Sequence, residues 1–200
     1  MKEIIFYGRG GQGAVTAANL IVQAAFLEGK YGSAYPSFGA ERRGAVVNGY
    51  ARIDNYPINV HQQIYNPDIV VVLDKKILQM TNVLNGLKEN GIVILNTDKV
   101  IEDFIVPNGK LFIVDATRIC QELGLIISGW AVVNTAILGS LSKATNIVSL
   151  DSIVKAIKQN WKESIAQKNI EATINEKLSV LGNVNKGCLL YTSPSPRDRQ

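Results

Sequence analysis

Cysteine and histidine are scarce in this chain of 200 residues, and their scarcity excludes several kinds of site. The two cysteines, Cys120 and Cys188, stand far apart and form no CxxC motif. This spacing excludes an iron–sulfur cluster or a zinc site built from this chain alone. It also fits a reducing compartment better than a disulfide-stapled secreted domain. The single histidine, His61, falls in a stretch of alternating polarity. We expect its side chain to face solvent rather than to act in catalysis.

Charge and long apolar runs are also in short supply. The formal net charge is only +4 and the charges are scattered, so the sequence does not indicate a nucleic-acid partner. No apolar stretch reaches the length of a membrane span. The N-terminus leads into a strand-like run without a cleavage pattern. We therefore expect a cytoplasmic protein with no membrane partner, and a chain of this length can bury a full hydrophobic core.

Common catalytic signatures are missing as well. The chain has no P-loop, no HExxH and no GxSxG. Asp74, Asp98 and Asp115 each follow an apolar run. A carboxylate there could act as an acid or a metal ligand, but helix capping is the favoured role. Cys120 has no histidine or basic neighbour in sequence that would activate it, which favours a buried structural thiol. We therefore predict no catalytic residue and no metal site on this chain.

The chain does show a regular alternation of strand-like and helix-like segments. Apolar runs and alternating patterns predict strands at residues 3–7, 45–53, 56–64, 69–73, 92–95 and 111–114. Helical spacing of apolar residues predicts helices at residues 14–26, 75–87, 117–123, 131–141, 149–160 and 165–174. The segments 45–53 and 56–64 form a predicted antiparallel hairpin, and residues 31–44 are expected to be irregular. This order predicts an α/β, Rossmann-like three-layer fold with a mostly parallel sheet.

The C-terminal residues do not fit this pattern. From about Val180 the apolar period stops, and YTSPSPRDRQ carries two Ser-Pro steps typical of disorder. The stretch CLLYTSPSPRDRQ resembles the translation of a sequencing-adapter read-through. We therefore predict one domain over residues 1–180 and interpret residues 181–200 as a disordered tail and a sequence artefact.

Polar residues follow each of the predicted parallel strands. The first strand runs into Gly8, the next into Asp74, and the last two into Asn96-Thr97-Asp98 and Asp115-Ala116-Thr117. Ligands bind at the carboxyl edge of open α/β sheets. The sequence therefore predicts a ligand crevice at this edge.

The first strand leads into a glycine-rich loop, Gly8-Arg9-Gly10-Gly11-Gln12-Gly13, which matches GxGxxG between a strand and a helix. Glycine lets the backbone approach a phosphate, and the N–H groups at the start of the helix point toward it. The alternative is that the glycines only permit a tight turn and close helix packing. The acidic residue that would hold a ribose is missing from Tyr31–Pro36, which argues against NAD.

A second loop carries paired arginines in the stretch Ser37-Phe38-Gly39-Ala40-Glu41-Arg42-Arg43-Gly44. Guanidinium groups bind phosphate or carboxylate oxygens in a bidentate manner. Arg42 and Arg43 could join Arg9 in an anion site. Equally, Glu41 could pair with one arginine while the other is solvated or faces another chain.

Three segments in this order resemble a known family. The stretches GRGGQGAVTAANLIVQAAFLEGKY, YPSFGAERRGA and NPDIVVVLD resemble the gamma subunits of 2-oxoacid:ferredoxin oxidoreductases, and the second stretch looks more like the pyruvate and branched-chain members. The resemblance covers residues 1–174. It implies one subunit of an enzyme that oxidatively decarboxylates a 2-oxo acid, with pyruvate the favoured substrate, makes acyl-coenzyme A and passes electrons to ferredoxin. The alternative is a stand-alone Rossmann-like nucleotide-binding protein.

The resemblance also implies where the cofactors and ligands lie. Thiamine diphosphate, Mg²⁺ and the 4Fe-4S clusters would sit on alpha, beta and delta-type partner subunits, and the gamma chain would help to bind coenzyme A and cover the active site. The positions that match the family motifs, and that are expected to contact coenzyme A or its phosphates, are Gly8, Arg9, Gly10, Gly11, Gln12, Gly13, Ser37, Arg42 and Arg43.

Overall fold

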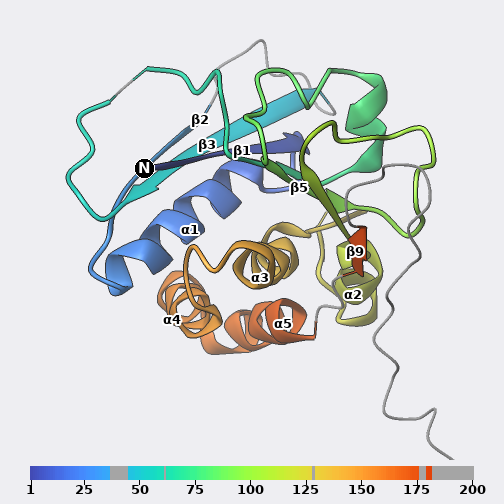
Figure 1. Ribbon diagram of the computed structural model, residues 1–200. Coiled ribbons are helices and arrows are strands. Elements are labelled where there is room, and N and C mark those ends of the chain that lie inside the picture. The colour runs from blue at the N-terminus through green and yellow to red at the C-terminus, as the bar shows by residue number, and fades with distance from the viewer. Residues whose placement is uncertain (37–44, 61, 128, 176–178, 182–200) are drawn as a thin grey trace, which may run out of the picture.

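The computed structural model describes residues 1–36, 45–60, 62–127, 129–175 and 179–181. Within these residues, seven strands form one sheet in the order β2-β3-β1-β4-β5-β6-β9 (Figure 1). The strands are β1 (Lys2–Arg9), β2 (Tyr31–Pro36), β3 (Val46–Asp54), β4 (Ile69–Val72), β5 (Ile92–Asn96), β6 (Lys110–Val114) and β9 (Ser179–Leu181). The predicted domain boundary falls near β9, and because residues 182–200 lie outside the described residues, the predicted tail stays a prediction.

The centre of the sheet is parallel and its margins are antiparallel. Strands β1, β4, β5 and β6 run parallel to one another, whereas β3, β2 and β9 pair antiparallel with their neighbours. The parallel strands are buried on both faces, which explains their continuous apolar runs. The predicted α/β fold with a mostly parallel sheet is confirmed, and its antiparallel pair is formed by β2 and β3 instead of the predicted segments 45–53 and 56–64.

The helices gather on one face of the sheet (Figure 1). They are α1 (Ala14–Leu27), α2 (Ala116–Glu122), α3 (Asn134–Thr145), α4 (Leu150–Asn160) and α5 (Glu163–Ile174). Their apolar sides and one side of the sheet form a single large core. The predicted helix at 131–141 begins later, because Trp130–Ala131 forms β8, which pairs with β7 (Ile126–Ile127) in a small separate hairpin.

The predicted strand at 56–64 is wrong, since no strand is assigned to its described residues. Both edges of β3 are already occupied, by β1 and by β2, so this segment cannot pair with β3 as predicted. It crosses the sheet instead, and the buried Arg52 holds it there by donating from Nη1 to the Val60 carbonyl and from Nη2 to the Gln62 carbonyl. Glu3 accepts the third bond from Arg52, at 3.0 Å.

The strand that pairs with β3 in its place is β2, which falls in the stretch expected to be irregular. Tyr35 lies opposite Tyr50 across this pair and stacks on it with ring centroids 5.1 Å apart. Gly32 and Pro36 weaken the strand signal in the sequence. Pairing with the nine-residue β3 overcomes that weakness.

The predicted helix at 75–87 is also wrong beyond its first turn. Only Lys75–Gln79 is helical, as the 3-10 helix η1, and the chain then turns repeatedly up to residue 91. Asn82 Oδ1 accepts a hydrogen bond from the Leu84 N–H, and Gly86 adopts a φ of +75°. These local turns end the helix, yet Ile77 and Val83 still bury against the second face of the sheet.

Glu28, just after α1, ties this helix to the start of α4. Its carboxylate accepts bonds from Lys30 Nζ at 2.8 Å and from the Ser149 N–H at 2.6 Å. Burial opposes ionisation of Glu28, but these hydrogen bonds outweigh it and lower the pKa of the carboxyl to about 2. The ionised form therefore stabilises the folded state.

We expect Glu28→Gln to lower the free energy of unfolding at pH 7. A carboxyl whose pKa is lower in the folded state stabilises the fold above its unfolded pKa and loses that effect as the pH falls. The difference from the wild type should therefore shrink below about pH 4.5 and disappear near pH 2. Urea unfolding across this range measures it, with the exposed Glu102→Gln as control. A difference that does not change with pH would contradict the role of this carboxylate.

Within the described residues, no helix is long and apolar enough to cross a lipid bilayer. His61, for which a solvent-facing position is predicted, lies outside the described residues.

Candidate functional site

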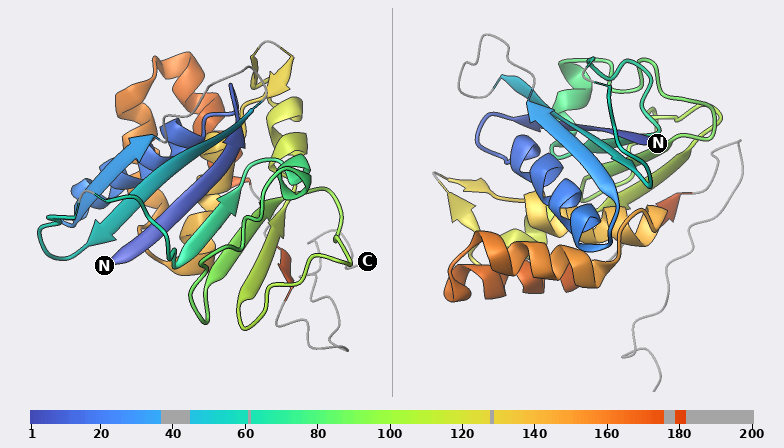
Figure 2. Two further views of the ribbon diagram at one scale, coloured as in Figure 1. Left: turned by 90° about the horizontal axis from the view of Figure 1, so that it is seen from above. Right: turned by 90° about the vertical axis from the view of Figure 1, so that its left-hand side faces the viewer.

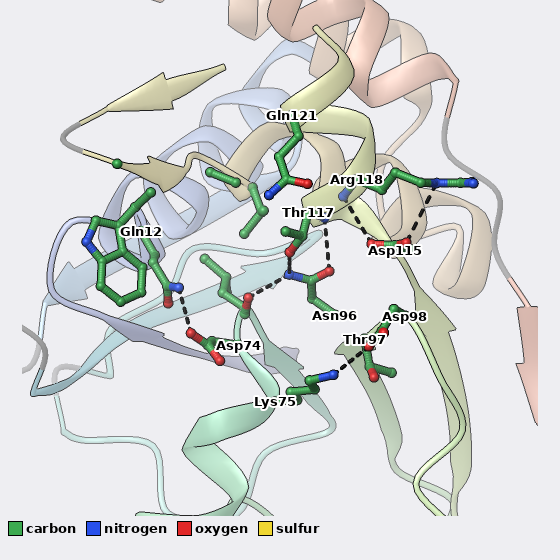
Figure 3. Close-up of a pocket in the computed structure, with 15 residues that line it drawn as sticks. Gln12, Asp74, Lys75, Asn96, Thr97, Asp98, Asp115, Thr117, Arg118 and Gln121 are labelled. Carbon is green, nitrogen blue, oxygen red and sulfur yellow. Dashed lines mark hydrogen bonds and ion pairs between the residues drawn. The ribbon is translucent and has the colours of Figure 1, made fainter. Parts of the chain in front are cut away.

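The carboxyl ends of β1, β4, β5 and β6 meet at one edge of the sheet, as the polar residues after each strand predict. A cavity of about 550 Å³ lies there, and α2 and the β7–β8 hairpin close its other side (Figure 3). It is lined by Gln12, Leu73, Asp74, Lys75, Asn96, Thr97, Asp98, Asp115, Thr117, Arg118, Gln121, Gly129, Trp130, Ala131 and Val133. We call it the carboxyl-edge cavity.

The glycine loop leads from β1 into α1 beside this cavity. A Cβ on Gly8 would lie 2.9 Å from that of Ala14, and a Cβ on Gly13 would lie 2.6 Å from Asn134 Nδ2. These two glycines therefore permit the tight turn and the close approach of α3. Gly11 differs, because its φ is +97° but a Cβ there would meet no atom of the described residues within 4 Å. Packing therefore does not account for every glycine of the loop.

The start of α1 has no side-chain cap among the described residues. Gly13 is the residue that begins the helix. The first N–H groups of a helix lack partners within the helix and attract anions. The Gly10 N–H, by contrast, already donates to the Ala45 carbonyl at 3.1 Å.

Arg9 and Gln12 of the loop are held by Asp74 at the end of β4. Arg9 contacts Asp74 Oδ2 through Nε at 2.7 Å and Nη2 at 2.6 Å, and Gln12 Nε2 donates to the same oxygen at 2.9 Å. Gln12 Oε1 also accepts the Arg9 N–H at 2.8 Å. The Arg9 guanidinium further lies 4.1 Å from the centre of the Trp130 ring. Arg9 is therefore fixed by Asp74 and Trp130.

The other members of the predicted anion site cannot be placed beside Arg9. Ser37, Arg42 and Arg43 lie outside the described residues, and their role stays a prediction. Trp130 was not singled out from the sequence. It stands on a two-residue strand, far along the chain from Arg9, and no local pattern signals their contact.

The predicted capping role is confirmed for two of the three strand-end aspartates. Asp74 Oδ1 accepts the Lys76 N–H at the start of η1, and Asp115 Oδ1 accepts the Arg118 N–H at the start of α2. Asp98 instead pairs with Lys75 Nζ at 2.5 Å. The hydrogen bond from Lys75 lowers the pKa of the Asp98 carboxyl.

Asn96 is the buried centre of the cavity wall. Its Nδ2 donates to the Leu73 carbonyl at 2.8 Å and to Thr117 Oγ1 at 2.9 Å, and its Oδ1 accepts the Thr117 N–H (Figure 3). It thereby joins the end of β4 to the start of α2. Lys75 and Arg118 lie at the rim, with 48% and 61% of their side chains exposed. The cavity thus combines fixed polar walls with exposed cations, which is suited to a polar, anionic ligand.

Cys120 lies on the buried side of α2. Burial raises the pKa of its thiol to about 12, and its Sγ donates to the Val132 carbonyl at 3.3 Å. The predicted buried structural thiol is confirmed, since a thiol with so high a pKa is a poor nucleophile.

Known proteins are similar to this chain in both sequence and fold. A family model for pyruvate ferredoxin/flavodoxin oxidoreductase matches residues 3–175. The chain is 52% identical over 176 residues to the pyruvate/ketoisovalerate oxidoreductases common subunit gamma of Pyrococcus furiosus, covering 86% of this chain and 93% of that protein. It is 48% identical over 172 residues to pyruvate synthase subunit PorC of Methanothermobacter marburgensis, with the same two coverages.

A solved structure agrees with these relatives. The crystal structure of pyruvate oxidoreductase subunit PORC from Thermotoga maritima matches with a TM-score of 0.73 and 34% identity, over 88% of this chain and 97% of that chain. The relatives are named as subunits of larger oxidoreductases, which disfavours the stand-alone alternative. The resemblance seen in the glycine loop and the segments after it is thus confirmed, and the chain belongs to the pyruvate ferredoxin/flavodoxin oxidoreductase family.

Proposed function

We propose that this chain is the gamma subunit of a multi-subunit 2-oxoacid:ferredoxin oxidoreductase that acts on pyruvate. The complex converts the 2-oxo acid and coenzyme A to acyl-coenzyme A and CO₂, and two electrons pass singly to ferredoxin. Family membership and the named subunits among the relatives support this proposal. We place the complex in the cytoplasm, in keeping with the two widely separated cysteines.

Within the complex, the gamma chain contributes to coenzyme A binding at its carboxyl edge. The observation that carries this proposal is the uncapped start of α1, next to Gln12 in the wall of a 550 Å³ cavity with cations at its rim. Coenzyme A carries several phosphate charges, which such N–H groups and cations attract. Lys75 and Arg118 have exposed side chains that could exchange their carboxylate partners for phosphate oxygens.

The chemistry of decarboxylation and electron transfer belongs to partner subunits of alpha, beta and delta type. Thiamine diphosphate with Mg²⁺ supplies the carbanion chemistry there, and 4Fe-4S clusters carry the electrons. The gamma chain holds coenzyme A and covers the active site. Arg9 has a positioning role in this scheme, since Asp74 and Trp130 fix it between the loop and the cavity.

Purification of a tagged chain from its native source tests the proposal. We expect it to bring down a brown assembly that contains iron and thiamine diphosphate, and that reduces ferredoxin only when pyruvate and coenzyme A are both present. The same chain expressed alone should bind neither iron nor thiamine diphosphate. Recovery of the native chain without partners, or an assembly without pyruvate-dependent reduction, would contradict the proposed function.

A further inference from the structure

The wall of the carboxyl-edge cavity includes one aromatic ring, the indole of Trp130. No other aromatic side chain of the described residues lines this cavity. Trp130 stands on β8, in the hairpin that closes the cavity opposite the strand ends, and it is 39% exposed (Figure 2, left). An indole that remains accessible in the wall of a cavity can stack on a planar ring of a ligand.

One face of this indole is already covered by Arg9. The guanidinium carbon of Arg9 lies 4.1 Å from the centre of the ring, and Asp74 holds the guanidinium through contacts at 2.6 Å and 2.7 Å. Arg9 is not among the described residues that line the cavity, so the indole separates it from the interior. The ion pair and the cation–π contact fix the ring in one orientation. A ring that is fixed before the ligand arrives loses little freedom on binding.

A free carboxamide lies close to this ring. α2 packs against β8, and Gln121 reaches from α2 into the cavity (Figure 3). The side chain of Gln121 makes no hydrogen bond with any of the described residues, whereas the amides of Gln12 and Asn96 are both engaged. A glutamine amide can donate to N7 of adenine and accept from its N6 amino group at the same time. Gln121 is therefore available to bind the edge of a base.

The charges around the cavity are balanced by pairing. Each of the three aspartates in its wall contacts a cation, which is Arg9, Lys75 or Arg118. Two of these cations, Lys75 and Arg118, lie at the rim. The described interior thus combines an aromatic ring and a free amide with paired charges, which suits a neutral heteroaromatic ring. The cations at the rim suit phosphates attached to such a ring.

We propose that Trp130 stacks on the adenine ring of coenzyme A and that Gln121 binds the edge of this ring, an inference that rests on the proposed function. Adenine is the only aromatic ring of coenzyme A. The thiol at the opposite end must reach the acyl group on the thiamine diphosphate of a partner subunit, so that end leaves this chain. The nucleotide end takes no part in acyl transfer and can stay in the cavity, whose volume of about 550 Å³ is typical of a small-molecule site.

Steady-state kinetics of the assembled enzyme with two acyl acceptors tests the stacking. Pantetheine 4′-phosphate keeps the thiol arm of coenzyme A but lacks its adenosine part. We expect Trp130→Leu to raise the KM for coenzyme A by about fivefold to a hundredfold, and to leave the KM values for pantetheine 4′-phosphate and pyruvate near those of the wild type. Trp130→Phe keeps a ring and should retain most of the affinity. Ile126→Ala, on the opposite face of the same hairpin, is the matched control.

A coenzyme A analogue with hypoxanthine in place of adenine tests the role of Gln121. Hypoxanthine carries an oxygen where adenine carries its N6 amino group, so the carboxamide oxygen of Gln121 loses its donor. We expect the wild-type enzyme to have a higher KM for this analogue than for coenzyme A. Gln121→Ala should bring the two KM values together.

The outcomes separate this inference from the proposed function. If Trp130→Leu raises the KM for both acceptors equally, or for neither, the stacking is wrong, although the assembly still forms acyl-coenzyme A and the proposed function stands. Equal KM values of the wild type for coenzyme A and its hypoxanthine analogue would overturn the role of Gln121. A wild-type assembly that forms no acyl-coenzyme A from pyruvate would overturn the proposed function, and the inference with it.

Discussion

Gly13→Ala should destabilise the chain far more than Gly11→Ala, although both glycines lie in the same loop. A side chain in a left-handed conformation costs about 1–2 kcal/mol, and both positions have positive φ, +97° at Gly11 and +83° at Gly13. At Gly13 the new Cβ would also lie 2.6 Å from the side chain of the buried Asn134. Such overpacking adds about 1–3 kcal/mol. Urea unfolding of the two variants measures the difference directly.

The same pair of variants separates the two interpretations of the glycine loop. A Cβ on Gly11 meets none of the described protein atoms within 4 Å, so beyond its backbone strain it leaves the described packing unchanged and projects where a ligand of the loop would lie. If the loop holds a phosphate of coenzyme A, Gly11→Ala should weaken coenzyme A binding to the assembled enzyme about tenfold or more. Unchanged affinity would leave the glycines with the structural role alone.

Coenzyme A affinity should fall by about tenfold to several hundredfold when Arg42 and Arg43 are both replaced by alanine in the assembled enzyme. Charge-assisted contacts to phosphate contribute roughly 1.5–3 kcal/mol each. Arg9 is already bound to Asp74, so it is a poor substitute for the two lost cations. The first half-reaction needs only thiamine diphosphate and the 2-oxo acid, and its rate should stay near that of the wild type.

Rapid mixing of this double variant with pyruvate, with and without coenzyme A, follows both half-reactions. Acyl transfer to coenzyme A should slow while the thiamine-bound intermediate still forms at the normal rate. A matched control is Lys158→Ala, which removes an exposed cation from α4. If formation of the intermediate slows as much as acyl transfer does, the arginines serve the catalytic subunit or the fold instead.

The parallel strands could be predicted from the sequence because their burial leaves a strong local signal. Residues 69–73, 92–95 and 111–114 are continuous apolar runs, and each belongs to a strand buried on both faces. The segment 56–64 has an alternating pattern, which is also typical of a strand, yet it forms none. Its predicted partner, β3, is already paired with β1 and β2. Availability of a pairing edge is a property of the whole sheet and leaves no local signal.

Only the position of the site could be predicted from the sequence. Because the carboxyl ends of parallel strands meet, the polar residues after the strands correctly predicted a cavity at that edge. The contact of Arg9 with Asp74, 65 positions later, depends on β1 and β4 being neighbours. The contact of Arg9 with Trp130 depends on the β7–β8 hairpin folding over the edge. Neither contact follows from spacing or composition.

Hydrogen–deuterium exchange of the assembled enzyme with and without coenzyme A tests most directly whether this chain holds coenzyme A at its carboxyl edge. We expect coenzyme A to slow exchange in peptides that cover residues 8–16, 96–98 and 115–121, which form the glycine loop and the walls of the cavity. Peptides from α4 and α5, which lie on the far side of the helix layer, should not change (Figure 1). Slower exchange confined to the partner subunits, with no change in the glycine loop or the cavity walls, would contradict a coenzyme A site on this chain.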